Sequence, residues 1–223
     1  WQFSEEAEGG FETVIRVPFA PESALSGLYR GQKVLEHVRY RRTFRCPAEW
    51  REEDRRVFLR FEAVDHEAKV LVDSKVAGTH RGGYGRFSFD VTDLLSNGEE
   101  HVVEVDVADP ADPKKDGVQP RGKQLGSEGI WYTRTTGIWQ SAWIESVPRT
   151  HFRTLRCRGD AEGRLSIEFG VAAPGKDDRV EFRVTGWGRS GRPVVAVVEA
   201  AAGDTSAAAM VNDVRPWGPD APA

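Results

Sequence analysis

The sequence predicts an all-β protein made of two antiparallel sandwiches. Segments of alternating apolar and polar residues recur along the chain, and turn residues separate them at intervals of about ten residues. This rhythm is typical of a β-sandwich, whereas a parallel sheet needs long helical segments between its strands. The strands change character near Val147-Pro148, because those that follow contain few aromatic residues. We therefore expect one domain over residues 1–148 and a smaller one over residues 149–223.

The strands of the first domain follow from a hydrophobic period of two. Residues 57–64 alternate Val57, Leu59 and Phe61 with other side chains, which predicts a strand with one buried face. The same alternation recurs at residues 68–72, 87–91 and 103–107. Residues 91–96 offer only a short helical turn, which Asp90 is expected to cap.

Two turns of this domain have distinctive residues. Asp73-Ser74-Lys75 predicts a hairpin turn directly after the strand at residues 68–72. Glycines at positions 82, 83 and 85 leave the backbone free to form a sharp corner or a bulge.

Residues 108–128 interrupt the strands with a long polar loop, ADPADPKKDGVQPRGKQLGSE. Loops of this length inside a compact domain are usually functional or disordered, and we favour function. The loop leads into residues 129–145, GIWYTRTTGIWQSAWIE, which contain three of the seven tryptophans of the chain. Flat aromatic faces stack on the C–H face of a pyranose, and forked donors bind its hydroxyls. This segment therefore predicts carbohydrate contact; the alternative is that its tryptophans belong to the core.

The second domain is expected to contain five short strands. They are residues 152–157, 165–171, 180–185, 194–199 and 207–211. An immunoglobulin-like sandwich has about seven strands, so this domain is predicted to lack roughly two of them. The resulting strand edge carries unpaired backbone groups and is expected to drive weak self-association into a homo-oligomer.

Bulk properties exclude several classes of protein. The chain has 223 residues and a net charge of −4, and the acidic residues near its basic clusters argue against a nucleic-acid partner. No apolar run reaches the roughly 18 residues of a membrane span, and no signal peptide is visible. Two cysteines far apart in sequence are expected to be free thiols, which favours the cytoplasm. Because the chain opens on Trp1 rather than Met, secretion stays open.

Four segments, taken together, resemble a known family. They are VDHEAKVLVD at residues 64–73, VAGTHRGGYGRFSFDVT at 76–92, RGKQ at 121–124 and WYTRTTGIWQSAWIE at 131–145. Their order is similar to the N-terminal sugar-binding domain of glycoside hydrolase family 2, which includes β-galactosidases and β-glucuronidases. The resemblance covers residues from about 35 to 148. The family usually places Asn-Gly where this chain has Asp73-Ser74, which predicts a looser turn here.

The resemblance implies a fold, and it implies which part of such an enzyme carries the catalytic residues. Residues 1–148 are expected to form a jelly-roll, galactose-binding-like sandwich, followed by an incomplete immunoglobulin-like sandwich. In this family two glutamates of a (β/α)₈ barrel catalyse hydrolysis with retention, and such a barrel needs roughly 250 residues. The chain contains no such pattern, so we expect it to have no catalytic residues of its own. Its histidines and cysteines lack metal-site spacing, and no nucleotide-binding glycine pattern is present, so we expect neither metal nor cofactor.

The resemblance also implies which residues contact substrate at the mouth of the barrel. These are Arg121, Lys123, Gln124, Trp131, Tyr132 and Arg134. In some β-galactosidases of the family an aspartate stands where this chain has Trp131, so strict galactose specificity is not expected. Trp139 and Trp143 alternate with strand spacing and are expected to pack in the core.

Three functions are therefore open at this point. The first, which we favour, is the non-catalytic N-terminal region of a retaining β-glycosidase that meets carbohydrate through the full-length enzyme. The alternative is a free-standing carbohydrate-binding module. A third possibility is a purely structural sandwich that contacts no ligand.

Overall fold

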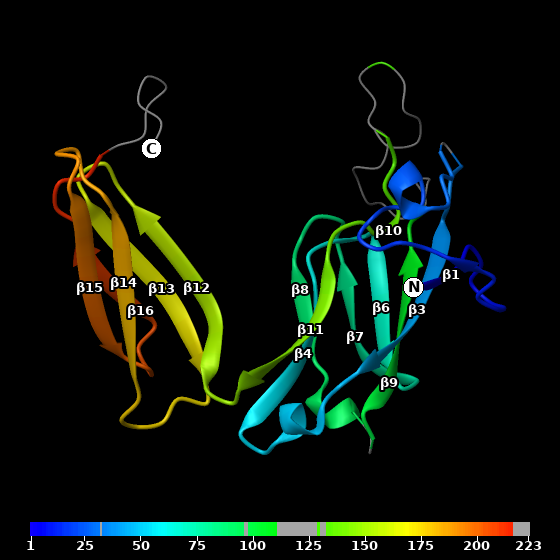
Figure 1. Ribbon diagram of the computed structural model, residues 1–223, viewed down its shortest axis with the longest axis horizontal. Helices are drawn as coiled ribbons and strands as arrows, with labels where there is room; N and C mark the ends of the chain where they lie inside the picture. The colour runs from blue at the N-terminus through cyan, green and yellow to red at the C-terminus, as the bar shows by residue number, and fades with distance from the viewer. Residues whose placement is uncertain (32, 96–97, 111–128, 130–132, 216–223) are drawn as a thin grey trace. The chain divides into compact units, whose positions relative to one another are not determined.

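The computed structural model describes residues 1–31, 33–95, 98–110, 129 and 133–215. The chain divides into two compact units, Trp1–Val147 and Pro148–Ala223 (Figure 1). The described residues form β-strands and three short 3-10 helices, η1 (Ala24–Ser26), η2 (Ala48–Arg51) and η3 (Thr92–Leu94), and they contain no α-helix. The all-β prediction is therefore confirmed. Within the described ranges, no helix is long and apolar enough to cross a membrane.

The first unit contains two main sheets and one short strand pair. The larger sheet has the order β2 (Thr13–Val14), β1 (Gln2–Ser4), β3 (His37–Arg45), β9 (Glu100–Ala108), β6 (Glu67–Val72), β7 (Lys75–Arg81). The second sheet has the order β11 (Ala142–Pro148), β4 (Arg55–Phe61), β8 (Phe87–Asp90). The short pair joins β5 (Val64–Asp65) to β10 (Gly137–Ile138).

The core of the first unit lies between these sheets. Along β9, Val103, Val105 and Val107 are buried, and the residues between them are partly exposed. Val57, Leu59 and Phe61 of β4 are buried in the same cluster, as their alternation predicts. Each such side chain contributes about 1.5–3 kcal/mol by its removal from water, so the period of two fixes which face of each strand turns inward.

The hairpin between β6 and β7 is tighter than the sequence suggests. Val72 pairs with Lys75, so only Asp73 and Ser74 form the loop, and both have positive φ, +46° and +65°. Positive φ at both positions is the requirement of a type I′ hairpin turn. The Asp73 carboxylate accepts a hydrogen bond from Val102 N at 2.9 Å and lies 2.7 Å from His101 Nδ1. The expectation of a looser turn is wrong, because these contacts stabilise an aspartate where the family usually places asparagine.

The predicted short turn near residue 91 is present as η3. Asp90 Oδ1 accepts hydrogen bonds from Thr92 N at 3.1 Å and from Thr92 Oγ1 at 2.6 Å. Arg56 also pairs with the Asp90 carboxylate at 2.9 Å. Asp90 therefore has a structural role at the start of this turn, although the N-cap residue of η3 is Val91 and not Asp90 as expected.

The second unit contains the five predicted strands in two sheets. They are β12 (His151–Gly159), β13 (Arg164–Ala172), β14 (Arg179–Trp187), β15 (Pro193–Ala201) and β16 (Ser206–Met210). One sheet has the order β12-β13-β16, and the other pairs β14 with β15. Its buried core is small and consists of Ile167, Phe169, Phe182 and Ala200.

Part of the inner face of this unit is exposed to solvent. Leu155 of β12 lies opposite Phe169 of β13, so its side chain is on the inner face, yet it is 54% exposed. Phe152 contacts the rings of Phe169 and Phe182 and is still 46% exposed. The two-stranded sheet therefore does not cover β12. Both cysteines are free; Cys46 is buried in the first unit and Cys157 is exposed on β12.

Candidate functional site

Several chain segments meet at one end of the first unit. Glu67 at the start of β6 lies opposite both Arg81 at the end of β7 and Ala108 at the end of β9. β5 directly precedes β6 and pairs with β10. The glycine corner after β7, Asp109 after β9 and residues 133–136 before β10 are therefore brought to the same end, near the β10 label in Figure 1.

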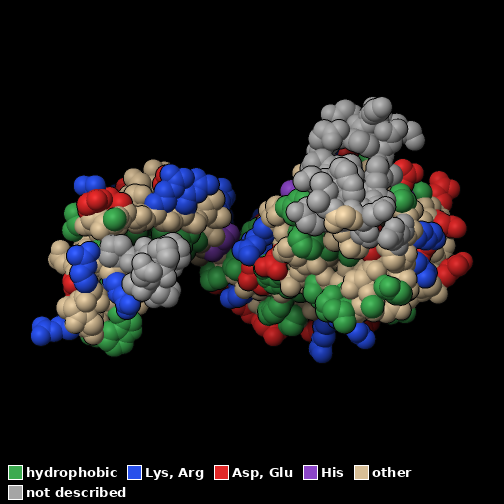
Figure 2. Space-filling view, turned by 90° about the horizontal axis from the view of Figure 1, so that it is seen from above, with side chains coloured by type: hydrophobic (Ala, Val, Ile, Leu, Met, Phe, Trp, Pro, Cys, Tyr) green, Lys and Arg blue, Asp and Glu red, His purple; other side chains and the backbone are tan. Residues whose placement is uncertain are grey.

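The surface of this end is chemically mixed. Figure 2 views the molecule from this side, and around the grey residues hydrophobic side chains lie interspersed with charged side chains of both signs.

The glycine corner is held rigidly against the strands below it. Gly82 has a φ of +127°, and Gly83 is buried so tightly that a Cβ would lie 2.6 Å from the Asp65 carboxylate. The indole Nε1 of Trp139 donates a hydrogen bond of 2.8 Å to the Gly83 carbonyl oxygen. These contacts explain why this corner needs glycine, and they fix the position of the next residue, Tyr84.

Tyr84 forms an exposed aromatic pair with Trp139. The Tyr84 side chain is 66% exposed, and its ring lies edge-on to the Trp139 ring with centroids 5.6 Å apart at 71°. Trp139 follows β10, which is anchored because Ile138 N donates a hydrogen bond to Tyr40 Oη at 3.2 Å. A Cβ at Gly137 would collide with that same hydroxyl, so the chain approaches Tyr40 as closely as glycine permits.

A buried polar cluster lies at the same end and consists of Glu22, Asp109, Arg134 and Thr136. Nη2 of Arg134 donates to Asp109 Oδ2 at 2.7 Å, to the Asp109 carbonyl at 2.6 Å and to the Leu35 carbonyl at 3.1 Å. Nε of Arg134 donates to Thr136 Oγ1 at 3.1 Å, and that hydroxyl donates to Asp109 Oδ2 at 2.8 Å. The guanidinium is therefore bound to interior acceptors.

The carboxylates of Glu22 and Asp65 also contribute to the electrostatics of this cluster. Glu22 Oε2 accepts a hydrogen bond from Thr136 N at 3.3 Å, and burial raises the pKa of Glu22 above its usual value. Burial lowers the pKa of Arg134, an effect that the charges of Glu22 and Asp65 oppose. Because the ordinary pKa of arginine lies far above neutral pH, Arg134 keeps its charge and balances the buried carboxylates.

Six residues were predicted to contact substrate, and one of them, Arg134, lies among the described residues. Arg134 is 5% exposed and belongs to the polar cluster. The other five lie outside the described residues: Arg121, Lys123, Gln124, Trp131 and Tyr132.

The expectation that Trp139 and Trp143 pack in the core is wrong. Both are half-buried, and neither belongs to the core cluster. On β11 the residues that pack against the core are Ala142 and Ile144, so Trp143 falls on the other face of the strand. Trp139 is held outside the core by its hydrogen bond to Gly83.

Sequence reasoning missed several residues of this end. Tyr84 lies in the segment 76–92 but was not predicted to contact substrate, although a bulky residue after two glycines indicates an exposed corner. Asp109 and Glu22 gave no such signal, because their partners lie 25 and 114 residues away in sequence.

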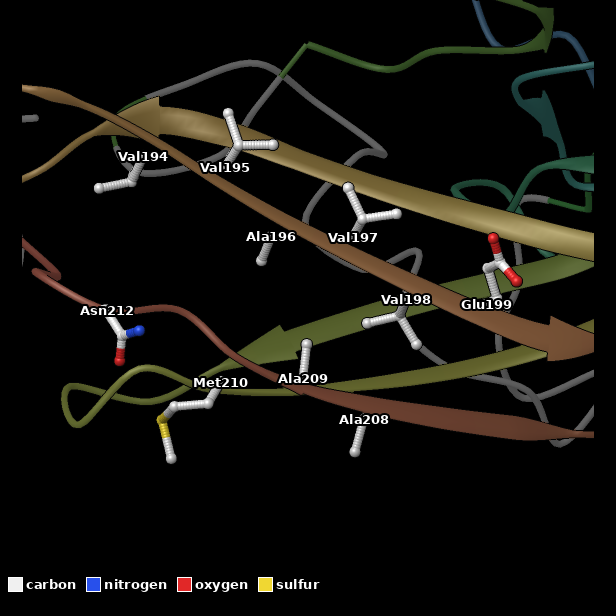
Figure 3. A pocket seen from close by; sticks show the side chains of 10 residues that line it. All are labelled: Val194, Val195, Ala196, Val197, Val198, Glu199, Ala208, Ala209, Met210 and Asn212. Atoms are coloured by element: carbon white, nitrogen blue, oxygen red, sulfur yellow. The ribbon is translucent and has the colours of Figure 1, made fainter.

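Two cavities of about 630 Å³ lie on the described surface, and Glu67, Arg81 and Ala108 of this same end line one of them. The first lies in the second unit and is lined by β15 and β16 with mostly aliphatic side chains, such as Val194, Val198 and Met210 (Figure 3). Its few polar side chains, among them Glu199 and Asn212, offer little to hold sugar hydroxyls. The second lies on the larger sheet of the first unit, beside the ion pairs Arg81–Glu67 and His37–Asp106.

Metal ligation has no support in the described residues. They contain no group of three or more His, Cys, Asp or Glu side chains that could hold an ion. The end that carries Tyr84 and the polar cluster combines an exposed aromatic ring with a buried, hydrogen-bonded cluster.

The chain matches a known family over more than half its length. Residues 29–148 match the model of "Glycosyl hydrolases family 2, sugar binding domain". A β-glucuronidase of Bacteroides fragilis is 33% identical over 104 residues, which is 46% of this chain and 14% of that protein. A β-galactosidase of Thermoanaerobacter pseudethanolicus is 28% identical over 149 residues, which is 66% of this chain and 19% of that protein. The chain thus spans less than a fifth of the length of these relatives.

Solved structures share the fold. The β-glucuronidase of Bacteroides uniformis superposes with a TM-score of 0.66 at 22% identity, covering 99% of this chain and 28% of that one. The β-glucuronidase of Bifidobacterium dentium gives a TM-score of 0.67 at 20% identity, covering 93% of this chain and 38% of that one. On the strength of the match over residues 29–148, this chain belongs to glycosyl hydrolases family 2, through its sugar binding domain.

Proposed function

We propose that this chain is the non-catalytic N-terminal region of a retaining β-glycosidase of family 2. In this proposal residues 1–148 are a jelly-roll, galactose-binding-like sandwich, and residues 149–223 are part of an immunoglobulin-like sandwich. Both support a catalytic barrel encoded elsewhere in the protein, and the first also forms part of the rim of its substrate pocket. The β-glucuronidases and the β-galactosidase that resemble this chain support a β-glycoside as the substrate class.

The observation that carries the proposal is the Tyr84–Trp139 pair, in which the Tyr84 ring is exposed. It lies at the end of the sandwich where residues 133–136 also lie, next to the segment predicted to contact sugar. An aromatic ring offers a flat apolar face to the C–H face of a pyranose. Because Gly83 and Trp139 fix the corner, a sugar that stacks here meets a preorganised surface and loses less free energy to ordering.

The pair forms only one wall of a pocket. The described residues around it supply a ring and a corner but no second polar wall facing it. We therefore expect monosaccharides to bind the chain with a Kd of about 1 mM or weaker, which corresponds to about −4 kcal/mol. The missing wall would come from the barrel.

The exposed inner face of β12 supports the immunoglobulin-like part of the proposal. Leu155 and Phe152 point toward a facing sheet of only two strands, and further strands alongside β14 would cover them. A sandwich of about seven strands buries this face completely.

Two measurements on the purified chain test the proposal. Incubation with chromogenic β-galactoside, β-glucuronide and β-mannoside substrates should give no turnover, because the chain supplies no barrel glutamates. Genuine hydrolysis that persists through purification would overturn the assignment of catalysis to another part of the protein.

Titration with sugars separates a pocket wall from a free-standing carbohydrate-binding module. A module with a complete pocket should give a saturable change in tryptophan fluorescence at micromolar galactose, glucuronate or their oligosaccharides. A single wall should give no saturation in that range. Micromolar saturation would therefore favour the independent module over the proposal.

A further inference from the structure

Two residues that bind each other flank residues 110–133, which include most of the long polar loop. Asp109 is the first residue after β9, and Arg134 lies three residues before β10. They are 25 residues apart in sequence, yet Nη2 of Arg134 lies 2.7 Å from Asp109 Oδ2 and 2.6 Å from the Asp109 carbonyl oxygen. The same guanidinium therefore binds both the side chain and the backbone of Asp109.

We propose that Arg134 and Asp109 form a buried clamp at the base of residues 110–133, and that Arg134 is a positioning residue rather than a sugar ligand. The inference rests on the proposed function, because it is this segment that carries the predicted sugar contacts. The clamp holds the two ends of the segment, residues 110 and 133, at one fixed point.

The chemistry of the clamp needs an arginine. Its planar guanidinium presents its donors in a fixed fork, and here Nε and Nη2 bind acceptors on Leu35, Asp109 and Thr136 at once. A lysine ammonium is a point charge that cannot span the same acceptors. Arg134 is 5% exposed and Asp109 is 1% exposed, so neither partner is free to meet a ligand at the surface.

Thr136 connects the clamp to the rest of the unit. Its hydroxyl donates to Asp109 and accepts from Arg134, and its backbone N donates to Glu22. The strand β10 begins at the next residue and is bound to Tyr40 through Ile138. The clamp is thus continuous with the rigid core and can fix the loop ends relative to the aromatic pair.

Limited proteolysis tests the clamp without any sugar. Trypsin sites lie inside the segment at Lys114, Lys115, Arg121 and Lys123. Their cleavage rate, measured by mass spectrometry well below the Tm of each variant, is divided by the rate at Arg153 and Arg156 in the second unit. This ratio cancels differences in protease activity and reports on the segment alone.

The variants are Arg134→Met, Asp109→Asn and Arg134→Lys. We expect the ratio to rise at least about tenfold in Arg134→Met and less in Asp109→Asn, which keeps an acceptor in place. Arg134→Lys should fall between Arg134→Met and wild type. If Arg134→Met fails to fold, Asp109→Asn decides the question by the same ratio.

The matched control is Asp73→Asn. It alters a partly buried pair, His101 Nδ1 and Asp73 Oδ2 at 2.7 Å, at the hairpin end of β6, the opposite end from Glu67. It should lower the Tm without changing the ratio. An unchanged ratio in both Arg134→Met and Asp109→Asn would overturn the clamp, as would an equal rise in the control.

A second readout separates this inference from the proposed function. Saturation-transfer NMR with methyl β-glucuronide and methyl β-galactoside should lose intensity in the clamp variants, while Arg134→Lys should recover part of it. If the proteolysis ratio rises but the sugar signals stay unchanged, the clamp does hold the ends of the segment, and the prediction that the segment contacts sugar is wrong.

Discussion

The Trp139 indole nitrogen and the Gly83 carbonyl oxygen lie 2.8 Å apart and form a hydrogen bond across 56 residues of sequence. This bond joins two motifs, HRGGY and TGIWQ, that the sequence shows only as separate segments. It explains why a half-buried tryptophan stands outside the core and why Tyr84 can be both exposed and fixed in position. The predictions below follow from this corner, from the polar cluster beneath it and from the open face of the second unit.

Gly83→Ala should destabilise the first unit. The new Cβ would lie 2.6 Å from the buried Asp65 carboxylate, and overpacking of this kind costs about 1–3 kcal/mol of unfolding free energy. Urea denaturation monitored by tryptophan fluorescence measures it. Gly85→Ala is the matched control, since its Cβ would meet nothing closer than His80 Nε2 at 4.0 Å, and it should change the free energy by less than about 0.5 kcal/mol. Equal losses in both variants would contradict the packing argument.

Trp139→Phe should distinguish the stability contributed by the indole hydrogen bond from that contributed by the aromatic ring. Phenylalanine keeps an aromatic face beside Tyr84 but leaves the Gly83 carbonyl without its donor, which should cost about 1 kcal/mol. Trp187→Phe provides the comparison, because Trp187 is 68% exposed in the second unit and should lose almost nothing. A Trp139→Phe protein as stable as wild type would show that the indole nitrogen does not stabilise the corner.

The buried carboxyl of Glu22 predicts a pH-dependent effect on stability. Burial raises the pKa of Glu22, so the folded protein binds this proton more tightly than the unfolded chain. The contribution of Glu22 is therefore most favourable at low pH, and stability falls as the pH rises through the folded pKa. Glu22→Gln removes this cost, so it should be more stable than wild type at pH 8, and the difference should vanish below about pH 4.3.

Chemical denaturation across this pH range checks the sign of the Glu22 effect. Glu8→Gln, at an exposed glutamate of the same unit, is the control and should follow wild type at every pH. A Glu22→Gln protein that is less stable than wild type at pH 8 would mean that hydrogen bonding to Thr136 and attraction to Arg134 outweigh burial.

Much of the fold could be predicted from the sequence because it depends on local patterns. The period of two along residues 103–107 identified which valines of β9 face the core, and five strands of the second unit were found at their places. The site was harder to predict. Glu22 lies in a segment without hydrophobic periodicity, and its partner Thr136 is 114 residues away, so no local sequence pattern predicts the contact. Trp139 was misplaced because strand spacing alone cannot tell a core face from a side chain bound to a neighbouring loop.

The open face of the second unit predicts weak self-association. Leu155 and Phe152 are exposed on the inner side of β12, and two copies could cover these faces mutually. Sedimentation velocity should show a concentration-dependent dimer that Leu155→Lys weakens. Leu25→Lys, at a residue of η1 that is 58% exposed, should leave the association unchanged. Monomer alone across a wide concentration range would contradict this prediction.

The most direct test of the account is saturation-transfer NMR of methyl β-glucuronide and methyl β-galactoside with wild type and Tyr84→Ala. At millimolar sugar, wild type should transfer saturation chiefly to the ring C–H protons of at least one glycoside, and Tyr84→Ala should lose most of that signal. Trp187→Ala, which removes an equally exposed ring from the second unit, should keep it. If neither sugar receives saturation, or if Tyr84→Ala matches wild type, the aromatic pair is not a wall of a sugar pocket.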